Sequence, residues 1–205
     1  MKEYMKKTLN YYENNAQEYA NNWTDDFLSN YDFTVPDIFL SYLDANANIL
    51  DLGCGTGRDS KCFLDKGYNV TAIDGSQEFC KMASKYLNLP VANINFLDMD
   101  YTDEFDGVFA CASLLHLNDT DLPIVLEKIY KSLKENGILY CSFKKGEASR
   151  IDDNSRFYND MTEEKFTKII NNLNGKFHLL KTWESNQYKS STKFINFILR
   201  REKYD

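Results

Sequence analysis

The sequence lacks several features that would each define a class of protein. In its 205 residues there is no run of about 18 apolar residues, so a membrane-spanning helix is not expected. The amino terminus, MKEYMKKTLNYYENN, has no apolar core of the kind that a signal peptide needs. Internal repeats and low-complexity tracts are absent as well. These absences predict a soluble, intracellular protein.

Cysteine and histidine are too scattered to form a recognisable framework. The five cysteines are an odd number and include no C-x-x-C pair, which predicts reduced thiols in the cytoplasm rather than disulfides. The only two histidines, His116 and His178, lie far apart and give no metal-ligand spacing with these cysteines. We therefore expect a cytoplasmic protein that holds no metal ion.

The bulk composition favours one packed domain. Hydrophobic residues make up 43% of the chain and aromatic residues 15%, far from the composition of disordered proteins. A chain of 205 residues is long enough for one full α/β domain and too short for two ordinary ones. The net charge of -7 repels phosphate backbones, so nucleic acid is disfavoured as a partner.

The segment from Asn48 to Ser60, NILDLGCGTGRDS, is the most informative. Its apolar run carries one acid, Asp51, and passes directly into three glycines spaced as G-x-G-x-G, which are Gly53, Gly55 and Gly57. This pattern predicts a buried parallel strand that ends in a tight turn before a helix. In open α/β sheets, nucleotide-like ligands bind at such a place.

Two residues of this segment bear on which ligand binds. A dinucleotide fingerprint needs a third glycine at position 58, where this chain has Arg58. The Asp51 carboxylate would repel a pyrophosphate but attract a cationic ligand. S-adenosylmethionine carries both an ammonium and a sulfonium group, so the segment favours it over NAD.

On these residues the chain resembles the class I S-adenosylmethionine-dependent methyltransferases, over roughly residues 45 to 145. The stretch from Gly53 to Ser60 is most similar to small-molecule methyltransferases of the tellurite-resistance and ubiquinone-biosynthesis type. The resemblance implies a Rossmann-like, seven-stranded, mostly parallel sheet with helices on both faces. It also implies one antiparallel strand near the C-terminus, at 193–199.

Strand and helix patterns alternate along the chain, as a parallel sheet requires. We expect helices at 2–20, 34–45, 58–66, 76–87, 121–134 and 162–173, and strands at 48–52, 68–73, 91–96, 107–112, 138–143, 177–183 and 193–199. A polar stretch at 146–160 is expected to be a loop on the substrate side. We interpret 1–205 as one methyltransferase domain, in which 1–45 caps the site, 46–145 binds the cofactor and 146–205 carries the substrate-side loop.

The resemblance assigns most candidate site residues to cofactor binding. Asp74 ends the second expected strand, where family members bind the ribose hydroxyls, although an acid there is also explained as a helix cap. Asp98 follows the third strand, where family members bind adenine, although Asp98 also fits a solvated acidic loop. The cofactor set further includes Asp51, Gly53, Cys54, Gly55, Gly75, Ser76, Met99 and Ala112.

The N-terminal segment contains the pattern Y-x-x-x-A-x-x-Y, formed by Tyr12, Ala16 and Tyr19. Spacings of four and three place these residues on one helical face. The resemblance implies that Tyr12 and Tyr19 close over the cofactor, and core packing explains the same spacing.

Candidate catalytic and acceptor residues are fewer. His116 follows the fourth strand and is either a general base, since its ordinary pKa of about 6.5 suits proton removal near neutral pH, or a packed, hydrogen-bonded histidine. Arg150, Arg156 and Tyr158, together with Lys144, Lys145 and Phe157, bring cations and aromatic rings to the loop after the fifth strand. They suit an anionic or aromatic acceptor as well as a solvated surface.

The predicted function is transfer of a methyl group from S-adenosylmethionine to a small-molecule acceptor. One alternative is a nucleic-acid methyltransferase, which the charge and the absence of proline in ACASLLHL, at 110–117, disfavour. Another is a module that binds the cofactor without turnover. No membrane partner is expected, and neither the acceptor nor the oligomeric state follows from the sequence.

Overall fold

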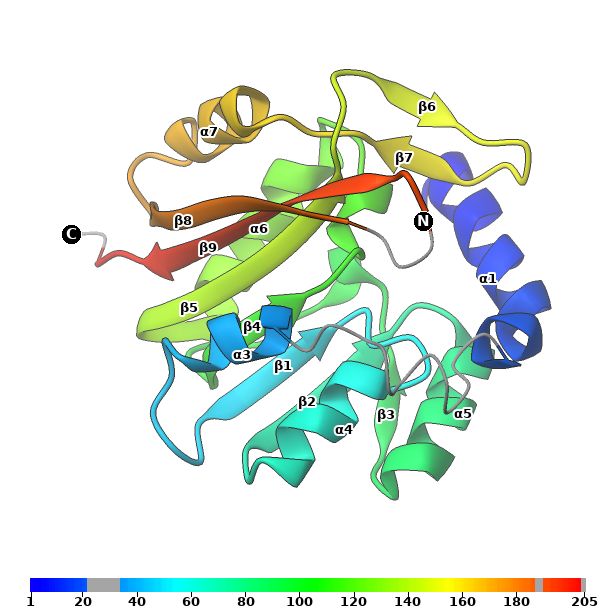
Figure 1. Ribbon diagram of the computed structural model, residues 1–205, viewed down its shortest axis with the longest axis horizontal. Coiled ribbons are helices and arrows are strands. Elements are labelled where there is room, and N and C mark those ends of the chain that lie inside the picture. The colour runs from blue at the N-terminus through cyan, green and yellow to red at the C-terminus, as the bar shows by residue number, and fades with distance from the viewer. Residues whose placement is uncertain (22–33, 187–189, 204–205) are drawn as a thin grey trace.

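The structure, a computed structural model, describes residues 1–21, 34–186 and 190–203. Helices and strands alternate through most of these ranges (Figure 1). The helices are α1 (Glu3–Asn21), α3 (Thr34–Leu40), α4 (Arg58–Asp65), α5 (Gln77–Leu87), η1 (Phe96–Asp98), η2 (Leu114–His116), α6 (Asp121–Ser132) and α7 (Glu163–Asn171), of which η1 and η2 are single 3₁₀ turns. The strands are β1 (Asn48–Leu52), β2 (Asn69–Asp74), β3 (Val91–Asn93), β4 (Phe105–Ala110), β5 (Leu133–Lys144), β6 (Ser149–Ile151), β7 (Phe157–Asn159), β8 (Phe177–Asn186) and β9 (Lys193–Arg201).

Seven strands form one sheet in the order β3-β2-β1-β4-β5-β9-β8. The pairs from β3 to β5 are parallel, whereas β9 runs antiparallel to both β5 and β8. This confirms the predicted seven-stranded, mostly parallel sheet and its antiparallel strand near the C-terminus. The carboxyl ends of β1, β2, β4 and β5 lie at one edge of the sheet, toward α1 and the β6–β7 hairpin (Figure 1).

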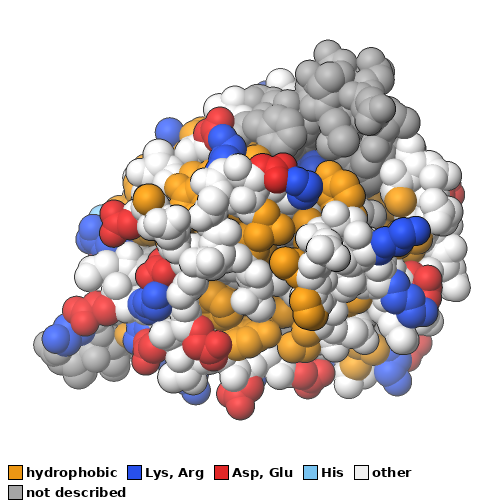
Figure 2. Space-filling view, turned by 90° about the horizontal axis from the view of Figure 1, so that it is seen from below, with side chains coloured by type: hydrophobic (Ala, Val, Ile, Leu, Met, Phe, Trp, Pro, Cys, Tyr) orange, Lys and Arg blue, Asp and Glu red, His pale blue; other side chains and the backbone are white. Residues whose placement is uncertain are grey.

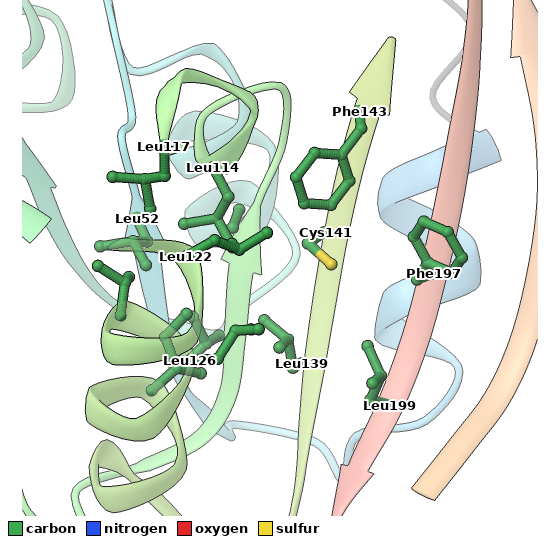
Figure 3. Packing of buried hydrophobic residues seen from close by; sticks show 14 of the residues in the cluster. Leu52, Leu114, Leu117, Leu122, Leu126, Leu139, Cys141, Phe143, Phe197 and Leu199 are labelled. Carbon is green, nitrogen blue, oxygen red and sulfur yellow. The ribbon is translucent and has the colours of Figure 1, made fainter. Parts of the chain in front are cut away.

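Helices cover both faces of the sheet because alternate residues of each buried strand point to opposite sides. On one face Leu139 of β5 lies in a cluster with Leu126 of α6 (Figure 3). On the other face Phe109 of β4 packs against Phe39 of α3 and Phe63 of α4, with ring centroids 5.2 and 5.0 Å away. This two-sided core holds the strand ends, and with them the site, in fixed positions.

The segment at 146–160 differs from the expected loop, because it contains the antiparallel hairpin of β6 and β7. The turn of this hairpin is held by Asp152, whose side chain accepts the backbone N–H groups of Asn154 and Arg156 at 3.1 and 2.8 Å. Such local side-chain bonds substitute for backbone pairing in a turn. The sequence pattern had shown only polarity there.

Several element boundaries also differ from the predictions. β3 ends at Asn93 rather than 96, because the Asn95 side chain accepts the N–H of Leu97 at 3.0 Å and turns the chain into η1. The first helix after the gap in the described residues ends at Leu40 instead of 45. β5 begins at Leu133, which pairs with Phe105, and not at 138. α5 begins one residue later than expected, because the Ser76 hydroxyl caps it by accepting the N–H of Phe79 at 3.2 Å.

Within the described ranges, no helix is both long and apolar enough to cross a membrane. All five cysteines are free thiols, and two of them, Cys80 and Cys141, are buried.

Candidate functional site

A large cavity lies at the carboxyl ends of the parallel strands, between the sheet and α1. Its volume is about 1360 Å³, and both the glycine loop after β1 and residues of β5, β8 and β9 line it. Pockets for one ligand usually have a volume of about 300 to 1,000 Å³. The cavity therefore has room for a cofactor and a second small molecule.

The glycine loop after β1 forms one wall of the cavity. Gly55 has a φ of +55°, and a Cβ placed on it would meet no atom within 4 Å, so its backbone is open to the cavity. Gly53, with a φ of +84°, packs so closely that a Cβ would lie 2.6 Å from the Cβ of Ser113. Both residues line the cavity with Cys54 between them. Only glycine adopts these angles without strain and leaves the main chain uncovered for a ligand.

Asp74 lies at the end of β2 and lines the cavity, although only 8% of its surface is exposed. One carboxylate oxygen accepts the N–H of Gly55 at 2.9 Å, and the other accepts the N–H of Ser76 at 2.8 Å. Burial raises the pKa of Asp74 to about 6, against the opposite effect of these bonds. Each oxygen keeps a further lone pair, so the carboxylate can accept hydroxyl groups of a ligand. Gly75 lines the cavity, and Ser76 lies behind it.

Asp51 occupies a different place from the one expected. It is buried, lies outside the cavity wall, and accepts the hydroxyl of Ser60 at 2.6 Å. Burial, followed by the negative charge of Asp59, raises the pKa of Asp51 to about 7. The acid that lines this part of the cavity is Asp59, which accepts the Nε–H of Arg58 at 2.9 Å. Asp51 thus supports the loop from behind, and sequence reasoning missed Asp59.

The residues predicted to bind adenine do not line the cavity. Met99 is 1% exposed and belongs to the core, and the exposed Asp98 ends η1. Asn95 and Phe96, just before them, form the wall there, with Phe79 of α5 nearby. An adenine role of Asp98 and Met99 therefore stays a prediction, whereas Phe96 belongs to the cavity wall.

The turn after β4 contains a residue with an unusual backbone angle and a hydroxyl group without a hydrogen-bond partner among the described residues. Ala112 has a φ of +50°, unusual for a residue with a Cβ, and its N–H donates to the Ser142 hydroxyl at 2.9 Å. The buried Ser113 hydroxyl has no hydrogen-bond partner among the described residues, although it lines the cavity. Buried polar atoms without a partner are rare and call for a ligand or water. An open glycine loop, a buried carboxylate and this hydroxyl suit the amino-acid and ribose groups of S-adenosylmethionine.

Helix α1 closes the cavity from above the sheet edge. Tyr12 and Tyr19 line the cavity with ring centroids 5.4 Å apart, and Ala16 between them is buried. The helix is anchored by Glu13, whose carboxylate accepts the hydroxyl of Ser76 at 2.7 Å and the N–H of Glu78 at 3.2 Å. The predicted Y-x-x-x-A-x-x-Y face thus both packs and faces the cavity.

His116 is held at both ring nitrogens. Nδ1 lies 2.6 Å from the carbonyl oxygen of Phe157, which can only accept, so Nδ1 carries the proton. Nε2 is then unprotonated and accepts the hydroxyl of Tyr12 at 2.8 Å. Burial lowers the pKa of His116 to about 4, so the ring is neutral at physiological pH. The imidazole therefore joins α1, η2 and β7 at the cavity wall.

Of the predicted cationic residues, Arg156 lines the cavity and Arg150 does not. The Arg156 guanidinium pairs with Asp152 at 2.7 Å and donates to the Tyr19 hydroxyl at 3.0 Å. The exposed Arg150 pairs with Asp160 at 2.8 Å. Tyr158, which lines the cavity, has three cations around its ring, those of Arg150, Arg156 and Lys144.

The cavity extends over β5, β8 and β9, and this second compartment was not predicted from the sequence. There the buried Asn196 accepts the Tyr140 hydroxyl at 2.8 Å and donates to the Trp183 carbonyl at 3.1 Å. Ser142 and Lys144 continue the same face of β5, as their spacing of two already indicated. Trp183 and Asn196 gave no sequence signal, because the β8–β9 pairing that brings them together is set by tertiary contacts.

A family model described as "Methyltransferase domain" matches residues 49–137. An uncharacterized methyltransferase of Staphylococcus carnosus is 28% identical over 66% of this chain and 74% of its own length. A glycine/sarcosine N-methyltransferase of Parasynechococcus marenigrum is 31% identical over 60% of this chain, but only 49% of its own length.

Solved structures share the fold over most of the chain. The 1,6-didemethyltoxoflavin-N1-methyltransferase of Burkholderia thailandensis has a TM-score of 0.81, covers 98% of this chain and 90% of its own, and is 21% identical. A TehB-like S-adenosylmethionine-dependent methyltransferase of Corynebacterium glutamicum has a TM-score of 0.73 at 17% identity and 91% coverage of this chain and 98% of its own. The family match and these relatives together indicate a methyltransferase whose cofactor is S-adenosylmethionine. Residues 49–137 thus match a methyltransferase domain, and the chain shares the fold of S-adenosylmethionine-dependent methyltransferases.

Proposed function

We propose that the protein methylates a small, planar acceptor held in the compartment over β5, β8 and β9, beside the cofactor. The observation that carries the proposal is the continuity of this compartment with the glycine loop and Asp74 in one cavity. Tyr12, Tyr158 and Trp183 line the cavity as a whole with aromatic rings, which favour flat ligands. The Burkholderia enzyme was solved with 1,6-didemethyltoxoflavin and S-adenosylhomocysteine bound, which supports the capacity of this fold for such an acceptor.

The cofactor end has distinct proposed roles. The open backbone of Gly55 lies against the amino-acid part of the cofactor, and the Asp74 carboxylate accepts the ribose hydroxyls. The orphan hydroxyl of Ser113 gains a partner when the cofactor binds. When bound, S-adenosylmethionine supplies an electrophilic methyl group on its sulfonium. The surrounding rings of Tyr12 and Tyr19 exclude water from this region.

We assign His116 a positioning role. A general base works best with a pKa near the operating pH, whereas burial lowers the pKa of His116 to about 4. Both of its nitrogens are also engaged, one by Tyr12 and the other by Phe157. His116 therefore orients the Tyr12 phenol at the cavity, and the acceptor atom reacts without a strong base.

The distribution of surface charge favours a small molecule over a nucleic acid as the methyl acceptor. On the face drawn in Figure 2, Lys and Arg side chains are interspersed with Asp and Glu side chains around hydrophobic ones. A phosphate backbone is bound by a continuous basic surface instead. Together with the net charge of -7, this arrangement favours a small-molecule partner. The five free thiols suit the cytoplasm, which we propose as the location.

Turnover tests the proposal. The purified protein is supplied with S-adenosylmethionine, and release of S-adenosylhomocysteine is followed against panels of phenols, planar N-heterocycles, aliphatic amines and a transfer RNA pool. We expect release with members of the planar panels alone. Release with aliphatic amines or RNA alone would contradict the proposed acceptor. Binding of S-adenosylhomocysteine without turnover in any panel would favour a non-catalytic module.

A further inference from the structure

Lys144 lies at the cavity and has no carboxylate partner among the described residues. It is the last residue of β5, and its side chain lines the cavity and is partly buried. Its neighbour Lys145 points away, is exposed, and pairs with Glu184. Because successive residues of a strand face opposite sides, this division between the two lysines follows from β5 itself.

Around Lys144, the positive side chains outnumber the carboxylates that pair with them. Three cations surround the ring of Tyr158, and the carboxylates of Asp152 and Asp160 pair with two of them, Arg156 and Arg150. The third, Lys144, lies over the ring face, with Nζ 3.9 Å from its centroid, and has no carboxylate partner among the described residues. Burial, followed by the positive charges of Arg150 and Arg156, lowers the pKa of Lys144. An anion entering the cavity would relieve this uncompensated positive charge.

The positions of Lys144 and His116 determine how large a molecule must be to contact both residues. The ring centroid of His116 lies 4.8 Å from that of Tyr158, and Lys144 Nζ lies 3.9 Å from the same centroid. Both groups contact the same ring, so they are no further apart than the sum of these two distances. A small acceptor can lie beside the Tyr12–His116 pair and reach Lys144 at the same time.

We infer that Lys144 recognises an oxyanion of the acceptor, so that the enzyme selects small planar acids. The inference rests on the proposed function, because it assigns Lys144 to the acceptor and not to the cofactor. The oxyanion is either a carboxylate or an ionised phenol, since an ammonium binds both as a point charge. Lys144 thereby determines specificity, whereas the nearby arginines are neutralised within the protein.

Binding of matched probes tests the inference. The protein is saturated with S-adenosylhomocysteine, and ligand-observed NMR then measures the affinities of benzoate, 4-nitrophenolate at alkaline pH, and the neutral benzamide. We expect at least one oxyanion to bind tenfold or more tightly than benzamide. Lys144→Met should remove this preference, and Lys145→Met should keep it. Benzoate alone identifies a carboxylate site, and 4-nitrophenolate alone a phenolate site.

The outcomes separate this inference from the proposed function. Equal binding of all three probes, no binding of any, or a preference that survives Lys144→Met would overturn the role of Lys144. Loss of S-adenosylhomocysteine affinity in Lys144→Met would assign the lysine to the cofactor and overturn it as well. If the unaltered protein fails to bind S-adenosylhomocysteine at all, the proposed function itself fails.

Discussion

The two ends of the cavity are built in different ways. At the proposed cofactor end, backbone groups make the contacts that fix the site. The N–H groups of Gly55 and Ser76 donate to the Asp74 carboxylate, and the glycine loop follows directly from β1. At the acceptor end side chains from distant segments meet, as where Tyr12 of α1 contacts His116 of η2. The proposed cofactor end is therefore built from segments close together in the sequence, whereas the proposed acceptor end is built from segments far apart.

Gly55→Val should cause the largest loss, because it damages the backbone on which the cofactor end depends. We expect cofactor affinity to fall more than 100-fold, since valine is strained at a φ of +55° and its side chain enters the cavity. Isothermal titration with S-adenosylhomocysteine measures the affinity. Gly175→Val is the matched control, because Gly175 also has a positive φ and open surroundings but lies outside the cavity wall. Equal affinity in the two variants would refute the loop assignment.

Asp74→Ala should weaken binding of S-adenosylhomocysteine by about 1.5 to 3 kcal/mol, the usual cost of losing charged-acceptor hydrogen bonds. Titration calorimetry measures the loss, and circular dichroism checks that the domain stays folded. An unchanged affinity would leave Asp74 only the structural role of holding the loop and the start of α5.

The same carboxylate predicts a pH dependence. Hydroxyl donors need the ionised form, so cofactor affinity should fall as the pH drops through about 6, the raised pKa of Asp74. For the free protein the sign is opposite: the folded state binds the proton more tightly than the unfolded state, so this group's contribution to stability decreases as the pH rises from about 4 to 6. Titrations at pH 5 to 8 test the first effect, which should disappear in Asp74→Asn.

His116→Ala tests the acceptor end. Two hydrogen bonds are lost, so we expect stability to fall by about 2 kcal/mol and the thermal midpoint by about 4 to 8 °C. Turnover with an accepted substrate should fall less than 100-fold, and cofactor affinity should change little. His178→Ala, at an exposed position of β8, is the control. A stable variant with a 100-fold or greater loss of turnover would instead make His116 a general base.

Glu13→Gln should have the smallest effect, because it only loosens the anchor between α1 and α5. Hydrogen bonds from the Ser76 hydroxyl and the amides of α5 lower the pKa of Glu13, although burial opposes this. We expect a two- to fivefold loss of cofactor affinity, equivalent to about 0.4 to 1 kcal/mol. Glu18→Gln, on the exposed side of the same helix, should bind normally. Equal effects in the two variants would remove the proposed anchor.

The sequence predicted more of the residues that line the proposed cofactor end than of those that line the proposed acceptor end. Gly55 and Asp74 were predictable because a strand followed by glycine, and an acid at the end of the next strand, are local patterns that parallel pairing brings together. Asp51 was assigned to the cofactor set; its side chain lies behind the loop, because the direction of one side chain depends on packing, and its role in cofactor binding stays a prediction. Asp59, in the first turn of α4, lines the cavity instead.

The sequence by itself determined the alternation of strands and helices, the order of the glycine loop, and the residue types at the strand ends. These features depend on hydrophobic periodicity and on backbone angles, which act over a few residues. Only the tertiary structure decided that β9 inserts between β5 and β8 and thereby brings Asn196 to Tyr140. Likewise, only the tertiary structure places Lys144 beside Tyr158 with no carboxylate partner among the described residues, while Arg150 and Arg156 pair with Asp160 and Asp152. Pairing of charges depends on distances between segments far apart in the chain, and those distances exist only once the core has packed.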